Sequence, residues 1–346
     1  MNAPETSAYT GVPVLVTGGA SFIGSHLCEW LVKAGARITV ADDCSSGKIE
    51  NLGVIQGDIV FKKGDLRDAA FTRDVVRGQA IVFHLAAAHG GRGYIETHPV
   101  ECMNNLLLDH TVFAEAARAG ARKIVHASSA CVYPTHLQTE KDRLLLKDSD
   151  AGFDEPGRAF ADGEYDWAKL MGEMQLRAFH KQHGLDGVAC RIFTAYGERE
   201  NESHAVIALI AKAIARMDPF PIWGNGKQTR NFTYVGDIVT GLGLAGATLS
   251  GFAPINVGSS THNSVLELCE EIFSVLGWRP QHFDFQMDKP IGVGSRAADS
   301  TFCKRALGWA PGIPLGEGIR KTVTWYAEAN RDVRPEDLER RLMERD

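Results

Sequence analysis

Several features that mark particular classes of protein are missing from this chain of 346 residues. Its seven cysteines stand singly, with neither a C-x-x-C pair nor the spacing of a disulfide framework, and the odd number leaves at least one unpaired. This pattern favours a reducing cytoplasm over an oxidising compartment. We also find neither internal repeats nor a low-complexity linker, and we predict no metal site.

A strong excess of one charge is missing as well. The net charge is −6, with basic and acidic residues interspersed, so the sequence does not indicate an electrostatic surface for nucleic acid or anionic lipid. No apolar run approaches membrane-spanning length, and the opening MNAPETSAYTG lacks the basic start and apolar core of a signal peptide. We therefore expect a cytoplasmic protein that binds neither nucleic acid nor membrane.

Short apolar runs alternate with segments of helical period from Val12 onward. The runs are PVLVTGG, RITVAD, AIVFHLAA and KIVHASS. This alternation is typical of parallel strands joined by crossover helices, and it predicts an α/β fold with a Rossmann-type, doubly wound parallel sheet. A composition of 44% hydrophobic residues is enough for two adjoining cores.

The order becomes less regular beyond about Gly187, although VACRIFTAY and APINVGS still resemble strands. We expect a Rossmann domain over 1–190, to which 229–258 returns, and a smaller α/β substrate-binding lobe made mainly of 191–346. The tail RPEDLERRLMERD predicts a charged helix.

A glycine-rich turn joins the first strand to a helix in VLVTGGASFIGSHL. Glycines at such a turn let the backbone approach a pyrophosphate, which the free N–H groups of the helix N-terminus stabilise. The turn alone is weak evidence, because glycines also serve ordinary turns. The candidate cofactor-binding residues here are Gly18, Ser21, Phe22, Ile23 and Gly24.

The second strand ends at Asp42, close to the offset at which an acidic side chain meets the adenosine ribose. Because a carboxylate there would repel a 2′-phosphate, the sequence favours NAD over NADP. Further cofactor contacts are predicted after the third and fourth strands, at Asp65, Leu66, Leu85, Ala86 and Ala87.

These motifs resemble the extended short-chain dehydrogenase/reductase family, specifically its NAD-dependent nucleotide-sugar epimerases and dehydratases. The resemblance runs from Val14 to about Tyr326 and includes TGGASFIGSHL, HLAA, SSACVYP, YDWAK, RIFTAYG, GNGKQTRNFTYVGD and SRAADSTFCKRALGWAP. One departure is Ser21, which replaces the middle glycine of the family's T-G-x-x-G-x-x-G. A serine fits there if its φ is negative, so we expect altered NAD packing and not its loss.

The segment EYDWAKLMGEMQLRAFHKQHG has the apolar spacing of an amphipathic helix and carries Tyr165 and Lys169 on one face. The resemblance implies that this pair and Ser129 remove a hydroxyl proton from the sugar while hydride passes to NAD. A nearby ammonium and nicotinamide cation would lower the pKa of the tyrosine toward working pH. A noncatalytic NAD-binding sensor of the same fold is the alternative, although such a protein more typically lacks Tyr165 or Lys169.

Cys131 stands where the resemblance places the residue that decides the reaction after C4 oxidation. The 4,6-dehydratases carry an Asp-Glu pair there and the uronate decarboxylases a glutamate, whereas this chain has Ala130-Cys131. A cysteine in SSACVYP resembles the GDP-mannose 3,5-epimerases, where it deprotonates or reprotonates ring carbons. The alternative is that the thiol is only a small buried hydrophobe.

The remaining site residues also follow from the resemblance. The loop HGGRGYI, with Gly90, Gly91 and Arg92, would contact the hexose, and His204 would replace the lysine that the 3,5-epimerases place after their YG motif. The alternative for this loop is a solvated acidic turn formed by Glu198, Glu200 and Glu202. Thr194 replaces the family's asparagine near the sugar, while Arg230 and Arg296 would clamp the diphosphate.

Together these motifs predict an NAD-dependent nucleotide-sugar epimerase with a GDP- or UDP-linked substrate, inverting C3 or C5 through a 4-keto intermediate. A UDP-hexose or UDP-uronate 4-epimerase is the second possibility and a nucleotide-sugar dehydratase the third. The resemblance also implies a homodimer, in which the helix bearing Tyr165 and the preceding helix (about 105–119) pair across a two-fold axis.

Overall fold

A seven-stranded parallel sheet forms the centre of the molecule in the computed structural model, which describes residues 7–331 and 337. The strand order is β12-β7-β5-β4-β1-β2-β3. The strands are β1 (Pro13–Thr17), β2 (Arg37–Asp42), β3 (Ile59–Lys63), β4 (Ile81–His84), β5 (Lys123–Ser129), β7 (Asp186–Ile192) and β12 (Phe252–Val257). From β1 the chain adds β2 and β3 on one side and then crosses back from β3 to β4 on the other side of β1, which creates the topological switch point where such sheets bind ligands.

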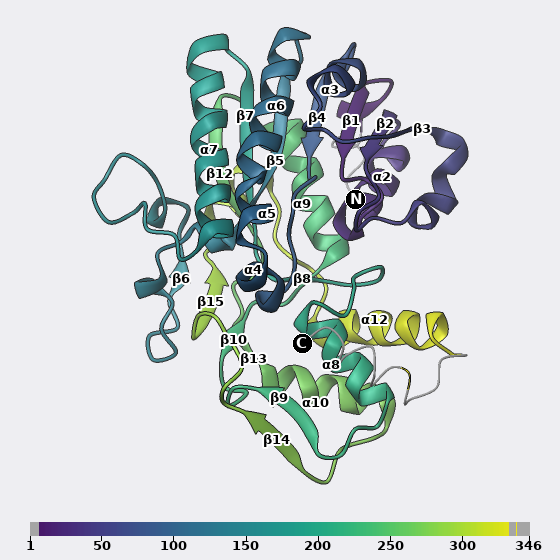
Figure 1. Cartoon of the computed structure of the whole chain (residues 1–346), viewed down its shortest axis with the longest axis vertical. Helices are drawn as coiled ribbons and strands as arrows, with labels where there is room; N and C mark the ends of the chain where they lie inside the picture. Colours follow the sequence, from purple (N-terminus) through teal and green to yellow (C-terminus); the bar gives the residue numbers. More distant parts are fainter. Residues whose placement is uncertain (1–6, 332–336, 338–346) are drawn as a thin grey trace.

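Helices cover both faces of this sheet (Figure 1). One face carries α2 (Phe22–Lys33) and α9 (Val235–Thr248), and the other carries α3 (Ala69–Val76), α6 (Asn105–Arg118) and α7 (Glu164–His183). Alternation along the strands separates the two cores, since Val14 and Val16 belong to the first and Leu15 to the second. Burial on both faces explains the continuous apolar runs of the sequence.

The second lobe occupies the lower half of Figure 1. Helices α8 (Ala205–Ile214), α10 (Val265–Leu276) and α12 (Leu315–Ala329) share a third core with β9 (Phe220–Trp223), which pairs with β14 (Phe283–Gln286). Between the lobes lies a small sheet of β13 (Asn263–Ser264), β10 (Thr229–Arg230), β15 (Ser295–Ala298) and β6 (Leu145–Leu146). Its short parallel pair of β10 and β15 brings Arg230 beside Arg296.

Shorter elements complete the connections. They are the pair β8 (Ala195–Tyr196) and β11 (Thr233–Tyr234), helices α4 (Arg92–Thr97), α5 (Pro99–Met103) and α11 (Thr301–Leu307), and the 3₁₀ segments η1 (Ser7–Tyr9), η2 (Ile49–Asp58), η3 (Ala130–Val132), η4 (Thr135–Leu137) and η5 (Asp148–Asp150). Within the described residues, no helix combines the length and apolarity that crossing a membrane requires.

The predicted fold class is confirmed, and each strand predicted from an apolar run is present. The segment returning from 229–258 supplies α9 and the edge strand β12. Helix α7 ends at His183 and is capped by Gly184, whose φ of +68° suits the left-handed cap position. The helix predicted for the tail lies outside the described residues, apart from Asp337. The division into domains stays a prediction.

Candidate active site

Two adjoining cavities, which share lining residues such as Gly18 and Leu85, lie at the carboxyl ends of β1, β4 and β5. We treat them as one site with an inner part, which Tyr165 lines, and an outer part, which Asp42 lines. All five predicted catalytic residues line its inner part: Tyr165, Lys169, Ser129, Cys131 and His204. The predicted substrate residues Gly90, Arg92, Thr194, Arg230 and Arg296 line the same part. Gly91 does not, because it caps α4 and lies against the carbonyl of Ser203.

The glycine turn after β1 is shaped by close backbone approaches. Gly18 has a φ of +67°, and a Cβ there would lie 2.8 Å from the amide nitrogen of Ala86. A Cβ at Gly24 would lie 2.1 Å from the carbonyl oxygen of Gly18. Ser21 is the N-cap of α2 with a φ of −83° and makes no side-chain cap bond, so the replacement of glycine costs no strain and leaves the helix N-terminus open toward the cavity.

The outer part of the cavity suits the adenosine end of a dinucleotide. It is lined by Asp42, Asp65, Leu66, Leu85, Ala86 and Ala87, all predicted cofactor residues. Asp42 is buried and accepts hydrogen bonds from the backbone N–H groups of Ala20 and Cys44, at 2.9 and 2.8 Å. A carboxylate has about four acceptor positions, so Asp42 shapes the turn and retains capacity for a ribose hydroxyl.

Tyr165, Ser129 and Lys169 line the inner part of the cavity together. The Nζ atom of Lys169 lies 6.0 Å from the centroid of the Tyr165 ring and donates a 2.9 Å hydrogen bond to the carbonyl of Ala127. Burial raises the pKa of the Tyr165 hydroxyl, and its hydrogen bond with Ser129 acts in the opposite direction. Lys169 is only 3% exposed, so the pair does not form an ordinary solvated helix face.

Cys131 lies between a cation and a carboxyl group. The Nη1 atom of Arg296 donates to its sulfur at 3.1 Å, and Asp166 interacts with the same thiol. Burial raises the pKa of Cys131, whereas Arg296 lowers it. The Nε atom of Arg296 also donates a 2.6 Å hydrogen bond to the side-chain oxygen of Gln138. In this structure, the arginine predicted to bind the diphosphate therefore contacts the thiol and Gln138.

His204 does not belong to a solvated acidic turn. Its Nδ1 lies 3.3 Å from Oε1 of Glu200, whose side chain is 3% exposed, and its ring contacts that of His89. Burial raises the pKa of Glu200 well above its ordinary range and lowers the pKa of His204. These shifts favour a protonated carboxyl group beside a neutral imidazole ring.

The two predicted substrate-binding arginines Arg230 and Arg92 differ in the groups that hold them. Arg230 donates to the backbone carbonyls of Thr229 and Ile291, at 2.8 and 2.9 Å, and burial near Arg296 lowers its pKa to about 9. A guanidinium held by carbonyls and near a second guanidinium suits an incoming dianion. Arg92 pairs with Glu96 and Asp162 at the cavity edge.

Three residues of the site were not predicted as such from the sequence: His89, Asp166 and Glu200. His89 opens the loop that was predicted to contact the hexose. Asp166 follows Tyr165 directly in YDWAK, and this adjacency was the available signal. Glu200 could be found only through its i,i+4 spacing to His204.

Comparison with known proteins extends these findings. A model of the NAD dependent epimerase/dehydratase family matches residues 14–258. The chain is 33% identical over 322 residues to GDP-mannose 3,5-epimerase of Arabidopsis thaliana, a match that covers 91% of this chain and 82% of that protein. It is 32% identical over 322 residues to UDP-glucose 4-epimerase of Mycolicibacterium smegmatis, covering 90% of this chain and 97% of that protein.

A solved structure of UDP-glucose 4-epimerase from Thermus thermophilus, in complex with NAD, has a TM-score of 0.78 and 25% identity. This match covers 92% of the chain and all of the neighbour (100%). The glycine cradle, the open helix N-terminus and the acidic outer cavity fit the same dinucleotide, and NAD is the cofactor. With the family model matching most of its length, the chain belongs to the NAD dependent epimerase/dehydratase family.

Proposed function

We propose that this protein is an NAD-dependent nucleotide-sugar epimerase that acts through a transient 4-keto intermediate. Tyr165 accepts the proton of the C4 hydroxyl, Ser129 holds that hydroxyl, and Lys169 stabilises the phenolate. Bound NAD supplies the oxidant for C4 and later the reductant. The contact between Tyr165 and Ser129 and the buried ammonium near the ring support these roles.

Inversion at C3 or C5 is the reaction that the site supports best, and the thiol of Cys131 carries this proposal. A 4-ketone makes the neighbouring C–H bonds acidic, and a base on one ring face then removes a proton. Cys131 lies in the sugar part of the cavity with Arg296 at 3.1 Å, a cation that favours the thiolate. A cysteine that served only as packing would not need a partly buried guanidinium directed at its sulfur.

His204 and Glu200 provide the second acid–base group in place of the lysine of the 3,5-epimerases. Glu200 passes its proton to Nδ1 while the other ring nitrogen gives its proton to carbon, so no buried imidazolium accumulates. The reverse transfer removes a proton from carbon. Inversion needs acid–base groups on both ring faces, and the cavity offers a thiol and an imidazole from different lobes.

A UDP-sugar 4-epimerase is the second candidate. The similar identities to a 3,5-epimerase and a 4-epimerase, 33% and 32%, favour neither reaction. The absence of a lysine from 197–205, after YG, supports this alternative. In that reaction the 4-keto sugar rotates in the cavity so that hydride returns to its opposite face, and Cys131 has no chemical role.

An isotope experiment separates the two reactions. The enzyme is incubated in D₂O with GDP-mannose, UDP-glucose or UDP-glucuronate, and the sugar protons are followed by NMR. Deuterium at C3 or C5, lost in Cys131→Ala and reduced in Cys131→Ser, is the expected result. Epimerised product without deuterium would establish 4-epimerisation, and Tyr165→Phe is the control that abolishes both reactions.

Three further features are proposed for the whole protein. Residues 1–190 with 229–258 hold the cofactor, and the remainder of 191–346 holds the nucleotide sugar, whose diphosphate binds Arg230. The protein forms a homodimer through α6 and α7 and works in the cytoplasm.

A further inference from the structure

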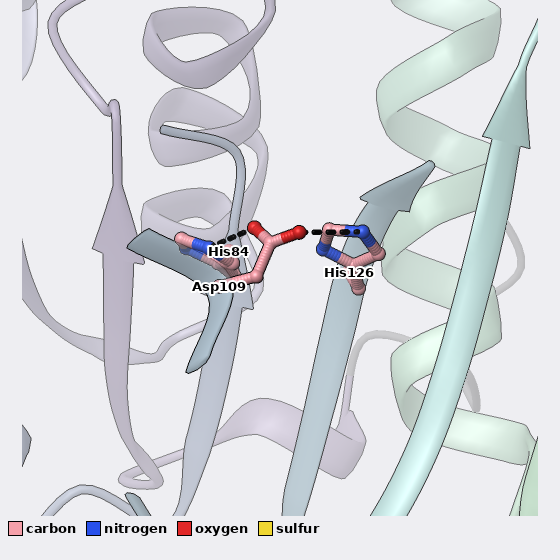
Figure 2. A group of neighbouring side chains, drawn as sticks. All are labelled: His84, Asp109 and His126. Atoms are coloured by element: carbon pink, nitrogen blue, oxygen red, sulfur yellow. Dashed lines mark hydrogen bonds and ion pairs between the residues drawn. The ribbon is translucent and has the colours of Figure 1, made fainter. Parts of the chain in front are cut away.

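A buried polar cluster lies between the central sheet and α6, below the active site. It consists of His84 at the end of β4, His126 in β5 and Asp109 in α6 (Figure 2). The side chain of each is 0% exposed. Nε2 of His84 lies 2.9 Å from Oδ1 of Asp109, whereas Nε2 of His126 lies 3.7 Å from Oδ2 and makes no hydrogen bond.

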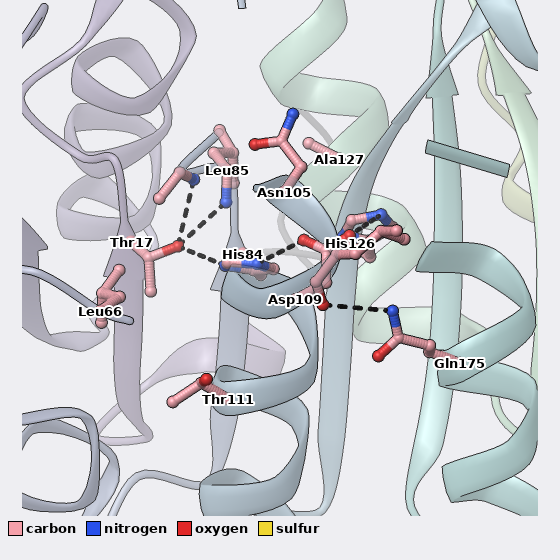
Figure 3. Close-up of polar contacts among 12 residues, drawn as sticks. Thr17, Leu66, His84, Leu85, Asn105, Asp109, Thr111, His126, Ala127 and Gln175 are labelled. Atoms are coloured by element: carbon pink, nitrogen blue, oxygen red, sulfur yellow. Dashed lines mark hydrogen bonds and ion pairs between the residues drawn. The ribbon is translucent and has the colours of Figure 1, made fainter. Parts of the chain in front are cut away.

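The neighbours of His84 fix its tautomer. The hydroxyl oxygen of Thr17 accepts hydrogen bonds from the backbone N–H groups of Leu85 and Ala86, at 3.1 and 3.2 Å (Figure 3). Its own proton therefore points to Nδ1 of His84, 2.8 Å away. His84 is then a neutral ring whose Nε2–H donates to Asp109, and the acceptor must be an ionised carboxylate or a carbonyl oxygen.

Two imidazoles and a carboxylate are also a donor set that transition metals accept. A metal on Nε2 of His84 would move the ring proton to Nδ1. The Thr17 oxygen would then have to accept a third hydrogen bond, and the Thr17 hydroxyl proton would lose its acceptor. The hydrogen bonds thus favour a neutral His84 bound to a carboxylate over a cation site.

Asp109 is a buried anion with incomplete local compensation. It has one hydrogen bond, Oδ2 has no donor, and both histidines are neutral, since burial lowers the pKa of His126 to about 3. Burial raises the pKa of Asp109, but His126, the hydrogen bond from His84 and the ammonium of Lys169 together lower it. Because both rings are neutral, Lys169 is the cation that balances this carboxylate. Burial lowers the pKa of Lys169, and Asp109 opposes that shift. Buried charges of this kind persist when an opposite charge is near.

Lys169 lies on the face of α7 that packs against Asp109 of α6. Gly172 follows Lys169 by three residues and so shares its helix face. A Cβ at Gly172 would lie 2.4 Å from Oδ2 of Asp109 and 3.0 Å from Nε2 of His126. The absence of a side chain at this position lets α7 pack directly on the carboxylate.

We propose that Asp109 is a positioning residue whose buried carboxylate holds Lys169 in its ammonium form beside Tyr165 and links that charge, through His84 and Thr17, to the cofactor-binding turn. This inference rests on the roles proposed above for Tyr165 and Lys169. It adds a group that touches neither substrate nor cofactor, and it joins the proton-transferring residues to the strand end that forms the dinucleotide site.

The groups that face Lys169 determine the expected pH dependence. They are Asp109 from α6, Cys131 from η3, Tyr165 from α7, His126 from β5 and His89 from the loop after β4. Asp109 is the carboxylate among them. Its removal lowers the pKa of both Lys169 and Tyr165, with the larger effect on the lysine, so the window in which Tyr165 is ionised and Lys169 charged moves to lower pH.

Asp109→Asn tests the proposal because the amide oxygen still accepts from His84 and only the charge is lost. In the pH profile of kcat, the midpoint of the alkaline limb is expected to lie at least one pH unit lower in Asp109→Asn than in wild type. This shift corresponds to a tenfold change in the proton concentration at the midpoint. The phenolate absorbance of Tyr165 in the NAD-loaded protein, taken as the difference from Tyr165→Phe, is expected to titrate at lower pH. This readout does not require turnover.

Two controls separate charge from structure. Val112→Ala removes buried contacts from the same helix, and His126→Phe removes a neutral ring; both are expected to change stability and to leave the two limbs in place. If Asp109→Asn does not fold, Gly172→Ala replaces it, since the added Cβ displaces the carboxylate from α7 and is expected to move the alkaline limb in the same direction.

Several outcomes would overturn the proposal. Unmoved limbs and an unmoved tyrosine titration in folded Asp109→Asn would show that the carboxylate does not act on Lys169. One equivalent of a transition metal in the wild-type protein, absent from Asp109→Asn, would make the cluster a metal site. Full activity of Tyr165→Phe is a different result, because it would refute the proposed function itself.

Discussion

The thiol of Cys131 shows how a single residue takes its chemistry from distant parts of the chain. Arg296, 165 positions away, contacts its sulfur, while Asp166 approaches from α7. Burial and Asp166 disfavour the thiolate, and Arg296 favours it. Reactivity at Cys131 therefore depends on a residue that the sequence assigned to the diphosphate.

Arg296→Gln is expected to slow deuterium exchange at C3 and C5 by at least tenfold, an order of magnitude typical of general acid–base effects. Loss of the guanidinium raises the pKa of Cys131, so the pH optimum of exchange moves upward. Exchange rates at saturating substrate are the measurement, since a lost diphosphate contact alone would raise KM.

Arg279→Gln is the matched control, because Arg279 forms an exposed ion pair with Glu270. Exchange in Arg296→Gln that matched this control at saturating substrate would assign Arg296 to binding alone.

Burial of the neutral His126 ring predicts that the folded protein loses stability in acid. Its pKa is about 3 in the folded protein and about 6.5 in an unfolded chain, so unfolding takes up a proton between these values. The stability that the neutral ring provides is complete above about pH 6.5 and falls by up to about 1.4 kcal/mol per pH unit below it.

His126→Phe is expected to flatten the fall in unfolding free energy between pH 6.5 and 4, measured by urea denaturation. His136→Phe is the control, since that ring is exposed. Equal slopes in wild type and His126→Phe would contradict the prediction.

Motifs in the sequence predicted the site residues that lie close to one another along the chain. Tyr165 and Lys169 lie on one helix, and Ser129 and Cys131 share one strand end, so their proximity is local. The contact of Arg296 with Cys131, the burial of Glu200 and the pairing of Asp109 with His84 depend on tertiary packing. A lone aspartate or histidine in the sequence carries no sign of such a partner.

At the scale of elements, the turn between β1 and α2 has no room for a side chain at Gly18. Gly18→Ala places a Cβ 2.8 Å from the Ala86 amide at a φ of +67°. We expect at least a tenfold weaker affinity for NAD, measured by calorimetric titration, because the turn must move away from the pyrophosphate position.

Gly78→Ala separates strain from contact. Gly78 has a φ of +73° and nothing within 4 Å of the added Cβ, so its variant has the same backbone penalty without the clash. NAD affinity in Gly78→Ala is expected to remain at the wild-type value. Equal losses in both variants would mean that general destabilisation explains the effect.

Elements were more predictable than their contacts. Period and composition located six of the seven central strands and the helix 164–183, since burial on both sheet faces gives continuous apolar runs. The edge strand β3 has no buried residue, and the sequence indicated it only as a third strand before Asp65. The two-residue strands β6, β10 and β13 and the four-residue strand β15 have no such period. They form because the lobes meet, and no local pattern in the sequence marks them.

At the scale of the whole molecule, apolar side chains remain exposed along α5, α6 and α7. Met103 is 39% exposed, Leu107 52% and Met174 38%. Apolar groups of this kind, on neighbouring elements, are typical of protein–protein contacts. Leu107 and Met174 lie on α6 and α7, the two helices at which the family resemblance implies dimerisation, and Met103 lies on α5, just before α6.

Leu107→Glu combined with Met174→Glu is expected to convert a dimer to a monomer in light scattering at micromolar concentration. Two charges on each copy would have to be buried in a two-fold contact. Phe285→Glu, at an exposed aromatic residue of β14, is the control and should leave the mass unchanged. A wild-type monomer would refute the prediction.

Strand β12 has a consequence for how the chain is made. It completes the sheet beside β7 only after α8 and β9 of the second lobe have been synthesised, since β7 ends at Ile192 and β12 begins at Phe252. During synthesis, β7 therefore presents an unpaired edge until residue 257 has left the ribosome. A nascent chain stalled between these strands should be a strong substrate for chaperones, and truncation there should yield aggregates and not an independent cofactor-binding fragment.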